Sequence, residues 1–249
     1  EGLRKSYFAY CLDAPSWQYN FLPHLEKISH DKAGFIFSEF DLIIAIDCGS
    51  LKRTNLGDEI IAKSENQTVI EFDHHPRTDN YADIEIRIPD ASSTAEVIYR
   101  FLKINGVRLN KNLASCLLTG ILTDTENFLY PSTSDKTIKI ASEMLAYGPS
   151  FLKIIQGAYR NKSLSAIKLW GLAMNNLAIN PRYGLAYTVL TNDDIVANGA
   201  GEEELEGVSN FLGNLDGVSG ILILREDSLG KIKGSLRTSK NNINLAALA

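Results

Sequence analysis

Val69-Ile-Glu-Phe-Asp-His-His-Pro76 carries the strongest structural signal in this sequence. Its β-branched and aromatic residues are typical of a buried strand, and Pro76 ends the strand because it has no amide hydrogen. Asp73, His74 and His75 then lie at the carboxyl end of that strand, where open α/β sheets bind their ligands. Two imidazoles beside a carboxylate suit a divalent transition metal, and a plain surface turn is the alternative.

Composition sets the class of protein. The 249 residues are 45% hydrophobic and 22% charged, which is typical of a globular protein of one or two domains. The net charge of −5 argues against a general affinity for nucleic acid, although bound metal ions would reverse the local sign. The three cysteines form no CxxC motif, which favours reduced thiols and a cytoplasmic location. Since no apolar run reaches the roughly 20 residues that span a bilayer, we expect no membrane association.

Two further acidic residues end apolar segments. Asp41–Asp47 reads as a second buried strand and Leu113–Asp124 as a buried helix. Asp47 has helix capping as its alternative role, whereas a buried Asp124 must be paired or bind metal. Crossover connections bring the ends of parallel strands to one edge, so these carboxylates and the histidines form a predicted metal site. Mixed aspartate and histidine ligands favour manganese, with zinc or cobalt tolerated.

The pattern between these segments predicts further elements. Ser6–Leu12 is expected to be a strand, Thr78–Pro89 irregular, and Gly201–Leu212 one acidic helix. Ser93 and Glu96 have the spacing of a helix capping box. Ser134–Gly148 is predicted to be an amphipathic helix whose inward residues are Ile138, Ile140, Ala141, Met144 and Leu145.

The last third of the chain has a different pattern. Leu185–Leu190 is a predicted strand, and Val218–Leu224 and Lys231–Leu236 form a predicted hairpin. The hairpin carries five basic residues between Arg225 and Lys240, which favour phosphate binding or simply a solvated surface. We expect a first domain over 1–158, a linker helix over 159–180 and a second domain over 181–249.

Five segments in this order resemble the DHH family of phosphoesterases, and within it the oligoribonuclease branch that is also active as phosphoadenosine-phosphate phosphatase. The resemblance implies an α/β fold: a parallel-sheet DHH domain with flanking helices and a smaller α/β DHH-associated C-terminal domain. The matching segments are Ile46-Asp-Cys-Gly-Ser50, Phe72-Asp-His-His-Pro76, Ser92-Ser-Thr-Ala-Glu96, Thr119-Gly-Ile-Leu-Thr-Asp-Thr125 and Gly234-Ser-Leu-Arg-Thr-Ser239.

The resemblance also implies roles for individual residues. Asp47 and Asp124 would be metal ligands, with Asp47 bridging two ions, and His74 would bind the second ion. His75 would donate a hydrogen bond to the scissile phosphate as a catalytic residue, and Asp73 would orient a histidine.

In the C-terminal domain of the family, the matching Ser235 and Arg237 would bind substrate. The implied function is hydrolysis of phosphoester bonds in short oligoribonucleotides or small nucleotides by a two-metal-activated water. Two Mn²⁺ ions are expected, with Mg²⁺, Co²⁺ or Zn²⁺ as alternatives. A cyclic-dinucleotide phosphodiesterase, a single-strand exonuclease and a non-catalytic nucleotide-binding remnant stay open, as does a homodimer. The Gly234–Arg237 segment argues against the related inorganic pyrophosphatases.

Three departures from the family pattern accompany these matches. The family's first motif, His-x-x-x-Asp-x-Asp, and its Gly-rich histidine loop do not occur here, so we expect a sequence truncated at both ends. We therefore expect an enzyme as the parent protein and an inactive chain as it stands. Glu126 occupies a position where the branch usually has glycine.

Overall fold

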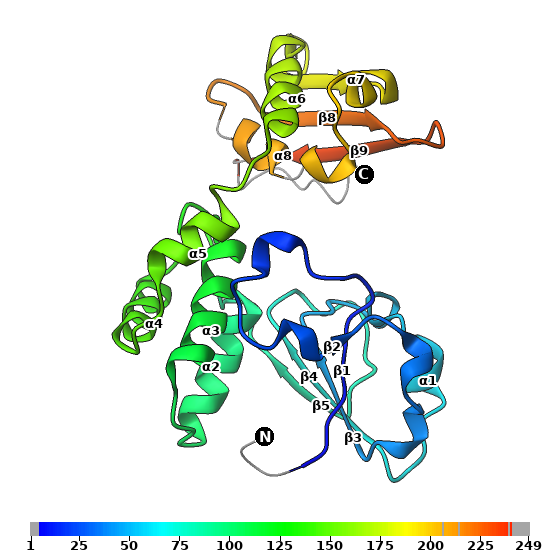
Figure 1. Cartoon of the computed structure of the whole chain (residues 1–249), viewed down its shortest axis with the longest axis vertical. Helices are drawn as coiled ribbons and strands as arrows, with labels where there is room; N and C mark the ends of the chain where they lie inside the picture. Colours follow the sequence, from blue (N-terminus) through cyan, green and yellow to red (C-terminus); the bar gives the residue numbers. More distant parts are fainter. Residues whose placement is uncertain (1–4, 206, 214, 239, 241–249) are drawn as a thin grey trace. The chain divides into compact units, whose positions relative to one another are not determined.

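The computed structural model describes residues 5–205, 207–213, 215–238 and 240 (Figure 1). They divide into two compact units, unit 1 over Glu1–Asn161 and unit 2 over Lys162–Ala249. Each unit combines a β-sheet with helices, so the predicted α/β class with a smaller second domain is confirmed. The finer predicted boundaries at residues 158 and 181 stay a prediction, and in the structure the helix α6 (Leu164–Asn175) packs within unit 2.

The central sheet of unit 1 is parallel and has the order β3-β4-β5. Its strands are β3 (Leu42–Ile46), β4 (Thr68–Asp73) and β5 (Ile84–Arg87). β4 confirms the predicted buried strand. β3 is a strand as predicted but not a buried one: Leu42, Ile44 and Ile46 are 43%, 51% and 52% exposed, because β3 is an edge strand of the described sheet. The irregular segment predicted at Thr78–Pro89 is wrong, since β5 lies there. Its Ile-Glu-Ile-Arg alternation has the period of a half-buried strand, which the surrounding polar residues had obscured.

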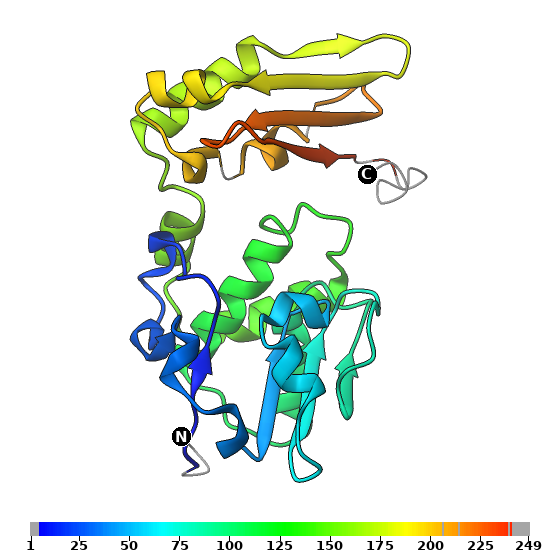
Figure 2. The same ribbon diagram turned by 90° about the vertical axis from the view of Figure 1, so that its right-hand side faces the viewer.

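Helices α2 (Thr94–Ile104) and α3 (Lys111–Asp124) lie on one side of this sheet (Figures 1 and 2). Phe72 on β4 contacts Phe101 on α2 edge to face, with 5.0 Å between ring centroids. A second layer is added by α4 (Asp135–Ala146) and α5 (Phe151–Ala158), which pack on α3. The core between these helices is apolar and contains Leu118, Ile121, Leu122, Met144 and Ile154.

Two details of α4 and of the N-terminal segment differ from prediction. Ile138 and Leu145 are 45% and 41% exposed, because α4 buries a narrower stripe through Ile140, Ala141 and Met144.

The predicted strand Ser6–Leu12 is reduced to β1 (Ala9–Tyr10). The remaining short elements of unit 1 are β2 (Ile28–Ser29), which pairs in parallel with β1, α1 (Gly57–Ile61) and 3₁₀ turns at Trp17–Tyr19, Leu25–Lys27, Lys32–Gly34, Phe37–Glu39 and Leu51–Thr54.

Unit 2 has a mixed sheet with the order β6-β7-β8-β9. Its elements are β6 (Ala178–Asn180), β7 (Leu185–Leu190), β8 (Gly220–Glu226), β9 (Ile232–Arg237), α6, α7 (Asn192–Ala197) and α8 (Val208–Leu212). The predicted hairpin is confirmed, with β8 and β9 antiparallel. The single helix predicted over 201–212 is wrong: a 3₁₀ turn at Glu202–Leu205 is followed by α8. Gly207 has φ +88°, a left-handed conformation that no helix interior accepts. No helix among the described residues is long and apolar enough to cross a membrane.

The start of α2 is held by a buried carboxylate. Ser93 caps the helix as predicted and accepts the Glu96 N–H at 3.1 Å. The Glu96 carboxylate, however, accepts the Ser92 hydroxyl at 2.7 Å, the Thr137 hydroxyl of α4 at 3.0 Å and Arg100. Burial alone would raise the pKa of Glu96, but these hydrogen bonds outweigh burial and hold it below its usual value.

We expect Glu96→Gln to destabilise the protein at neutral pH. A carboxyl group with a depressed folded-state pKa contributes stability above its unfolded pKa, and this contribution is lost as the pH falls through the folded-state value. The stability difference between wild type and Glu96→Gln should therefore shrink below about pH 4. Urea denaturation at several pH values measures it, and a difference that does not change with pH would contradict the assignment.

Close packing of α2 on α3 depends on Gly120. A Cβ atom at this position would lie 2.7 Å from the Ala95 Cβ, closer than side chains pack. We expect Gly120→Ala to destabilise the protein by about 1–3 kcal/mol, the usual cost of overpacking. Gly171→Ala in α6 is the matched control, since nothing lies within 4 Å of its added Cβ. That control should be neutral or gain up to about 1 kcal/mol from helix propensity. Equal stability of the two variants would contradict the packing argument.

Candidate metal centre

The ends of β3 and β4 lie at one edge of the unit 1 sheet. Directly after β3, the Asp47 N–H donates to the Phe72 carbonyl oxygen at 2.9 Å, which places Asp47 beside Asp73. Asp47 itself has φ +59°, a left-handed conformation that is uncommon outside glycine. Such a backbone costs on the order of 1 kcal/mol and is typical of functional sites. The Asp47 carboxylate projects from this turn and is half exposed.

His74 approaches two of the predicted carboxylates. Its Nε2 atom lies 3.2 Å from Asp124 Oδ2 and 3.9 Å from Asp47 Oδ1. Its Nδ1 atom lies 3.2 Å from the Ala91 carbonyl oxygen. Because a carbonyl can only accept, Nδ1 is the nitrogen that carries the hydrogen, and the Nε2 lone pair stays available to a metal.

Asp124 reaches the site from the last turn of α3. Burial raises the pKa of its carboxyl group and the neighbouring Asp47 raises it further, while His74 and His75 oppose the shift; the net direction is upward. The carboxylates of Asp47 and Asp124 both lie near the His74 ring, and a bound cation would offset the repulsion between them. The chain then turns through three left-handed residues, Glu126, Asn127 and Phe128. The φ of +49° at Glu126 explains why glycine suits this position in the family the sequence resembles.

His75 is oriented by the fully buried carboxylate of Asp73. Asp73 Oδ1 accepts both the His75 N–H and its ring Nδ1–H at 2.8 Å, and Oδ2 accepts the Gly49 N–H at 2.6 Å. Burial alone would raise the pKa of Asp73, but these donors and the charge of Arg87 outweigh it and lower the pKa. The carboxylate therefore fixes the ring tautomer, and His75 Nε2 is free to meet a ligand.

Thr94 completes the group, although the sequence indicated no role for it in a metal site. Its hydroxyl, in the first turn of α2, donates to Asp47 Oδ1 at 2.6 Å. The residue is 4% exposed. The one sequence feature that could have pointed to Thr94 was its position inside the Ser92–Glu96 segment, which matches the family. The hydrogen bond from Thr94 occupies one lone pair of Asp47 Oδ1 and fixes the orientation of the carboxylate. The remaining lone pairs are then directed toward the site where a metal would bind.

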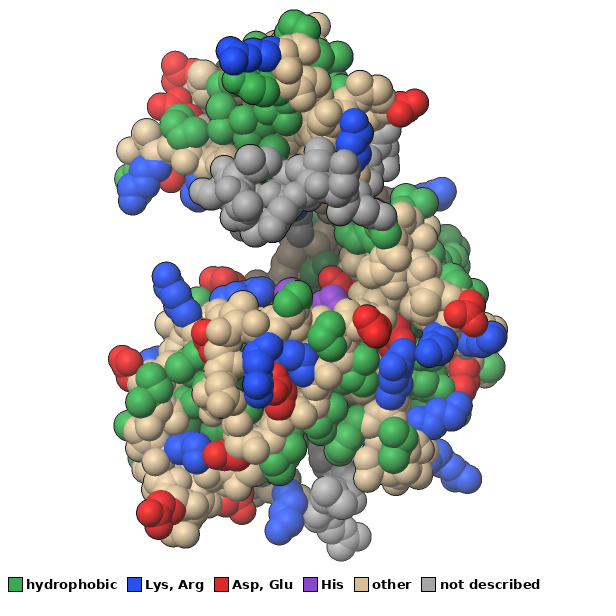
Figure 3. Space-filling model, turned by 180° about the vertical axis from the view of Figure 1, so that it is seen from behind, with side chains coloured by type: hydrophobic (Ala, Val, Ile, Leu, Met, Phe, Trp, Pro, Cys, Tyr) green, Lys and Arg blue, Asp and Glu red, His purple; other side chains and the backbone are tan. Residues whose placement is uncertain are grey.

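These donors fit a divalent ion. Donor atoms of Asp47, His74 and His75 lie within 4.8 Å of one another, and Asp124 lies next to His74. Carboxylate oxygens and a neutral imidazole nitrogen form a ligand set suited to Mn²⁺ or Zn²⁺. A cavity of about 400 Å³ lies beside Asp47 and Asp124 and is walled by α2 and α3. Histidine side chains reach the surface of the molecule with acidic side chains beside them (Figure 3).

The predicted substrate residues Ser235 and Arg237 lie on β9 in unit 2. Arg237 donates from Nε to the Asn210 side-chain oxygen of α8 at 3.3 Å. Their contact with substrate stays a prediction, as do the catalytic and ligand roles assigned to the unit 1 residues.

Comparison with known proteins supports the class that the sequence segments indicate. Residues 4–121 match the model of the DHH family, N-terminal domain. The chain is 26% identical over 240 residues to the Bacillus subtilis protein named bifunctional oligoribonuclease and PAP phosphatase NrnA, covering 94% of this chain and 73% of that protein.

Two further proteins support this assignment. A Streptococcus mutans protein named probable bifunctional oligoribonuclease and PAP phosphatase NrnA is 32% identical, over 72% of this chain and 57% of the relative. The crystal structure of an exopolyphosphatase-related protein from Bacteroides fragilis superposes with a TM-score of 0.85 at 28% identity, covering 93% of this chain and 69% of the other. The resemblance inferred from the five sequence segments is thereby confirmed.

Thr94 offers a direct test of the metal centre. We expect Thr94→Val to weaken Mn²⁺ binding about tenfold or more, because outer hydrogen bonds typically contribute 10–100-fold to metal affinity. Thr94→Ser keeps the hydroxyl and should stay within about twofold of wild type by the same reasoning. Isothermal titration with Mn²⁺ measures both variants. Equal affinities of the Val and Ser variants would contradict a role for this hydrogen bond.

Proposed function

We propose that the full-length protein, rather than this chain as it stands, hydrolyses phosphoester bonds in short oligoribonucleotides or in small nucleotides such as phosphoadenosine phosphate. The observation that carries the proposal is the placement of His74 Nε2 between the carboxylates of Asp124 and Asp47, next to His75 with its outer nitrogen free. The names of the B. subtilis and S. mutans relatives support this substrate class. The fold alone would not, since one fold serves many chemistries.

Divalent metal ions, with Mn²⁺ preferred and Mg²⁺, Co²⁺ or Zn²⁺ as alternatives, would supply Lewis acidity and lower the pKa of the attacking water. Asp47, His74 and Asp124 are the residues proposed to hold them. Their own arrangement supports this role: His74 keeps Nε2 unprotonated by donating from Nδ1, and Thr94 directs Asp47. We propose two ions as the working stoichiometry, with Asp47 shared between them.

His75 is the proposed catalytic residue. With Nδ1 donating to Asp73, the Nε2 atom of His75 bears a hydrogen only when the ring is protonated. A protonated Nε2 can donate to a phosphoryl oxygen while negative charge develops there. Asp73 stays ionised and orients the ring without touching substrate.

Ser235 and Arg237 are the proposed substrate-binding residues of unit 2. An arginine fork matches the geometry of a phosphate, and a serine hydroxyl can donate to a phosphate or a base. We also propose a cytoplasmic location, which the free thiols of Cys11, Cys48 and Cys116 support.

The activity itself is tested on the full-length protein, because the chain as it stands is expected to be inactive. The substrates are a dinucleotide of RNA and phosphoadenosine phosphate, in the presence of Mn²⁺. We expect phosphate or mononucleotide release that EDTA abolishes and added Mn²⁺ restores, because the proposed reaction needs a metal-activated water. Binding of either nucleotide without turnover would instead favour a nucleotide-binding protein. Hydrolysis that is indifferent to EDTA would contradict the metal-dependent mechanism.

The role of His75 is tested by His75→Ala. We expect kcat to fall by about 10²–10⁴-fold, as for loss of a residue that acts on the transition state, with substrate affinity within about threefold. His30→Ala is the control, since His30 is exposed and, in the part of the chain that the structure describes, its ring forms a hydrogen bond with the Cys11 carbonyl oxygen, far from this site in the sequence. An unchanged turnover number for His75→Ala would rule out the assigned role.

A further inference from the structure

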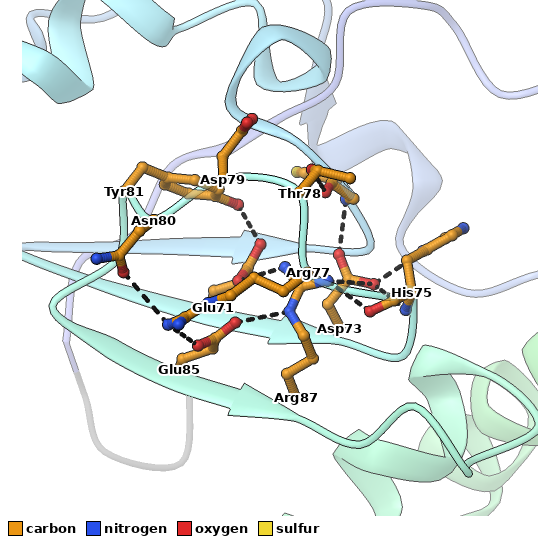
Figure 4. Close-up of polar contacts among 12 residues, drawn as sticks. Glu71, Asp73, His75, Arg77, Thr78, Asp79, Asn80, Tyr81, Glu85 and Arg87 are labelled. Atoms are coloured by element: carbon orange, nitrogen blue, oxygen red, sulfur yellow. Dashed lines mark hydrogen bonds and ion pairs between the residues drawn. The ribbon is translucent and has the colours of Figure 1, made fainter.

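One face of β4 and β5 carries charged residues in register. Parallel pairing sets Glu71 beside Glu85 and Asp73 beside Arg87, while the alternate residues face α2. Tyr81 covers this face and donates its hydroxyl to Glu71 Oε1 at 2.5 Å. Figure 4 shows these side chains converging next to His75. A buried polar network of this size needs an explanation beyond packing, because burying charged groups is costly.

Arg87 is the centre of the network and is only 6% exposed. Its Nε atom donates to Glu85 Oε1 at 2.7 Å, and its Nη2 atom forms an ion pair with Glu71 Oε2 at 2.7 Å. Arg77, which is 55% exposed, pairs with the other oxygen of Glu85. Two carboxylates from different strands therefore hold the Arg87 guanidinium group, Glu85 through a hydrogen bond and Glu71 through an ion pair in which Nη2 makes no hydrogen bond within the described part of the chain.

The remaining edge of the guanidinium group does not face a carboxylate directly. Its Nη1 atom donates to the His75 carbonyl oxygen at 2.6 Å and reaches the Pro76 carbonyl oxygen at 3.4 Å, while Asp73 Oδ1 lies 3.9 Å away. The sheet ladder has already ended there, since its last bond joins the Ile88 N–H to the Asp73 carbonyl oxygen at 3.0 Å. Arg87 thus supplies the donor that a neighbouring strand would otherwise provide.

Together these contacts determine the orientation of His75. Its N–H and Nδ1–H are bound by Asp73, and its carbonyl oxygen is bound by Arg87. Within the described part of the chain, Nε2 is the polar atom of His75 left without a hydrogen bond. One carboxylate holds the amide and the ring of His75, and the guanidinium group holds its carbonyl oxygen, which is the kind of restraint a preorganised donor requires.

We propose that Arg87 is a positioning residue that holds His75 in the orientation needed for catalysis. The proposal rests on the proposed function, in which His75 donates to a phosphoryl oxygen. A lysine would not substitute for Arg87, because an ammonium group is a point charge and lacks the rigid fork whose Nε and Nη1 atoms bond Glu85 and the His75 carbonyl at the same time.

Arg87→Lys and Arg87→Gln test the proposal, with Arg77→Lys as the matched control. Arg77 shares Glu85 with Arg87, and its guanidinium group otherwise donates to the Asn80 side-chain oxygen at 3.3 Å. In assays with an RNA dinucleotide and Mn²⁺, we expect both Arg87 variants to lower kcat by about 10–100-fold, since small misplacements of a reacting group cost this much. KM and Mn²⁺ affinity should stay within about threefold of wild type, and Arg77→Lys should change no parameter more than about twofold.

A second measurement is independent of activity. The chain has four histidines, so the ring ¹⁵N and ¹H signals of His75 can be assigned in the whole protein without substrate. We expect the Arg87 variants to shift the His75 ring signals and leave those of His24 and His30 in place, while Arg77→Lys leaves all four unchanged.

The two readouts separate the inference from the proposed function. If wild type hydrolyses no nucleotide but the His75 signals move in the Arg87 variants, the proposed function fails and the positioning of His75 stands. If wild type is active and the folded Arg87 variants keep its kcat, the inference is overturned. Unfolding of both Arg87 variants also overturns it, because Arg87 would then serve stability alone.

Discussion

The fully buried carboxylate of Asp73 is the constraint on which the site depends. A charge without access to water must be surrounded by donors, and the chain supplies them from two sources: the Gly49 amide after β3, and the amide and ring of His75 after β4. One side chain therefore ties the loop that carries Asp47 to the turn that carries the histidines. The DHH motif is a structural unit of the sheet edge as much as a set of reactive groups.

The second requirement is close packing of α2 and α3 on the same sheet. Gly120 lets α3 approach α2 at Ala95, one residue from Thr94 and one helical turn from Asp124. The same contact that builds the core thus brings a hydroxyl and a carboxylate to the end of β3. Stability and geometry of the metal centre are coupled here, because a change in helix spacing would move its ligands relative to the strands.

The sequence predicted the strands and helices that can be recognised from the spacing of their hydrophobic residues. The strands before Asp47 and Asp73 and the helix before Asp124 are long apolar runs, and parallel topology is enough to place their ends together. The patterns did not predict β5, since its four residues lie among polar ones, nor the role of Arg87, since no local rule reveals which backbone carbonyl an arginine will meet. The contact of Thr94 with Asp47, 47 positions earlier, was not predicted either, because it is set by tertiary packing.

The left-handed backbone of Asp47 has a consequence for the variation this position can tolerate. Among residues other than glycine, aspartate and asparagine adopt this conformation most readily. Asparagine or glycine would preserve the turn but remove the negative charge, whereas glutamate would keep the charge on a backbone less suited to the turn. Conformation and ligand chemistry thus select the same residue independently, so an exchange that satisfies one demand fails the other. Few substitutions are therefore expected at position 47 in proteins that bind metal at this site. Proteins that have lost metal binding are expected to carry asparagine or glycine there.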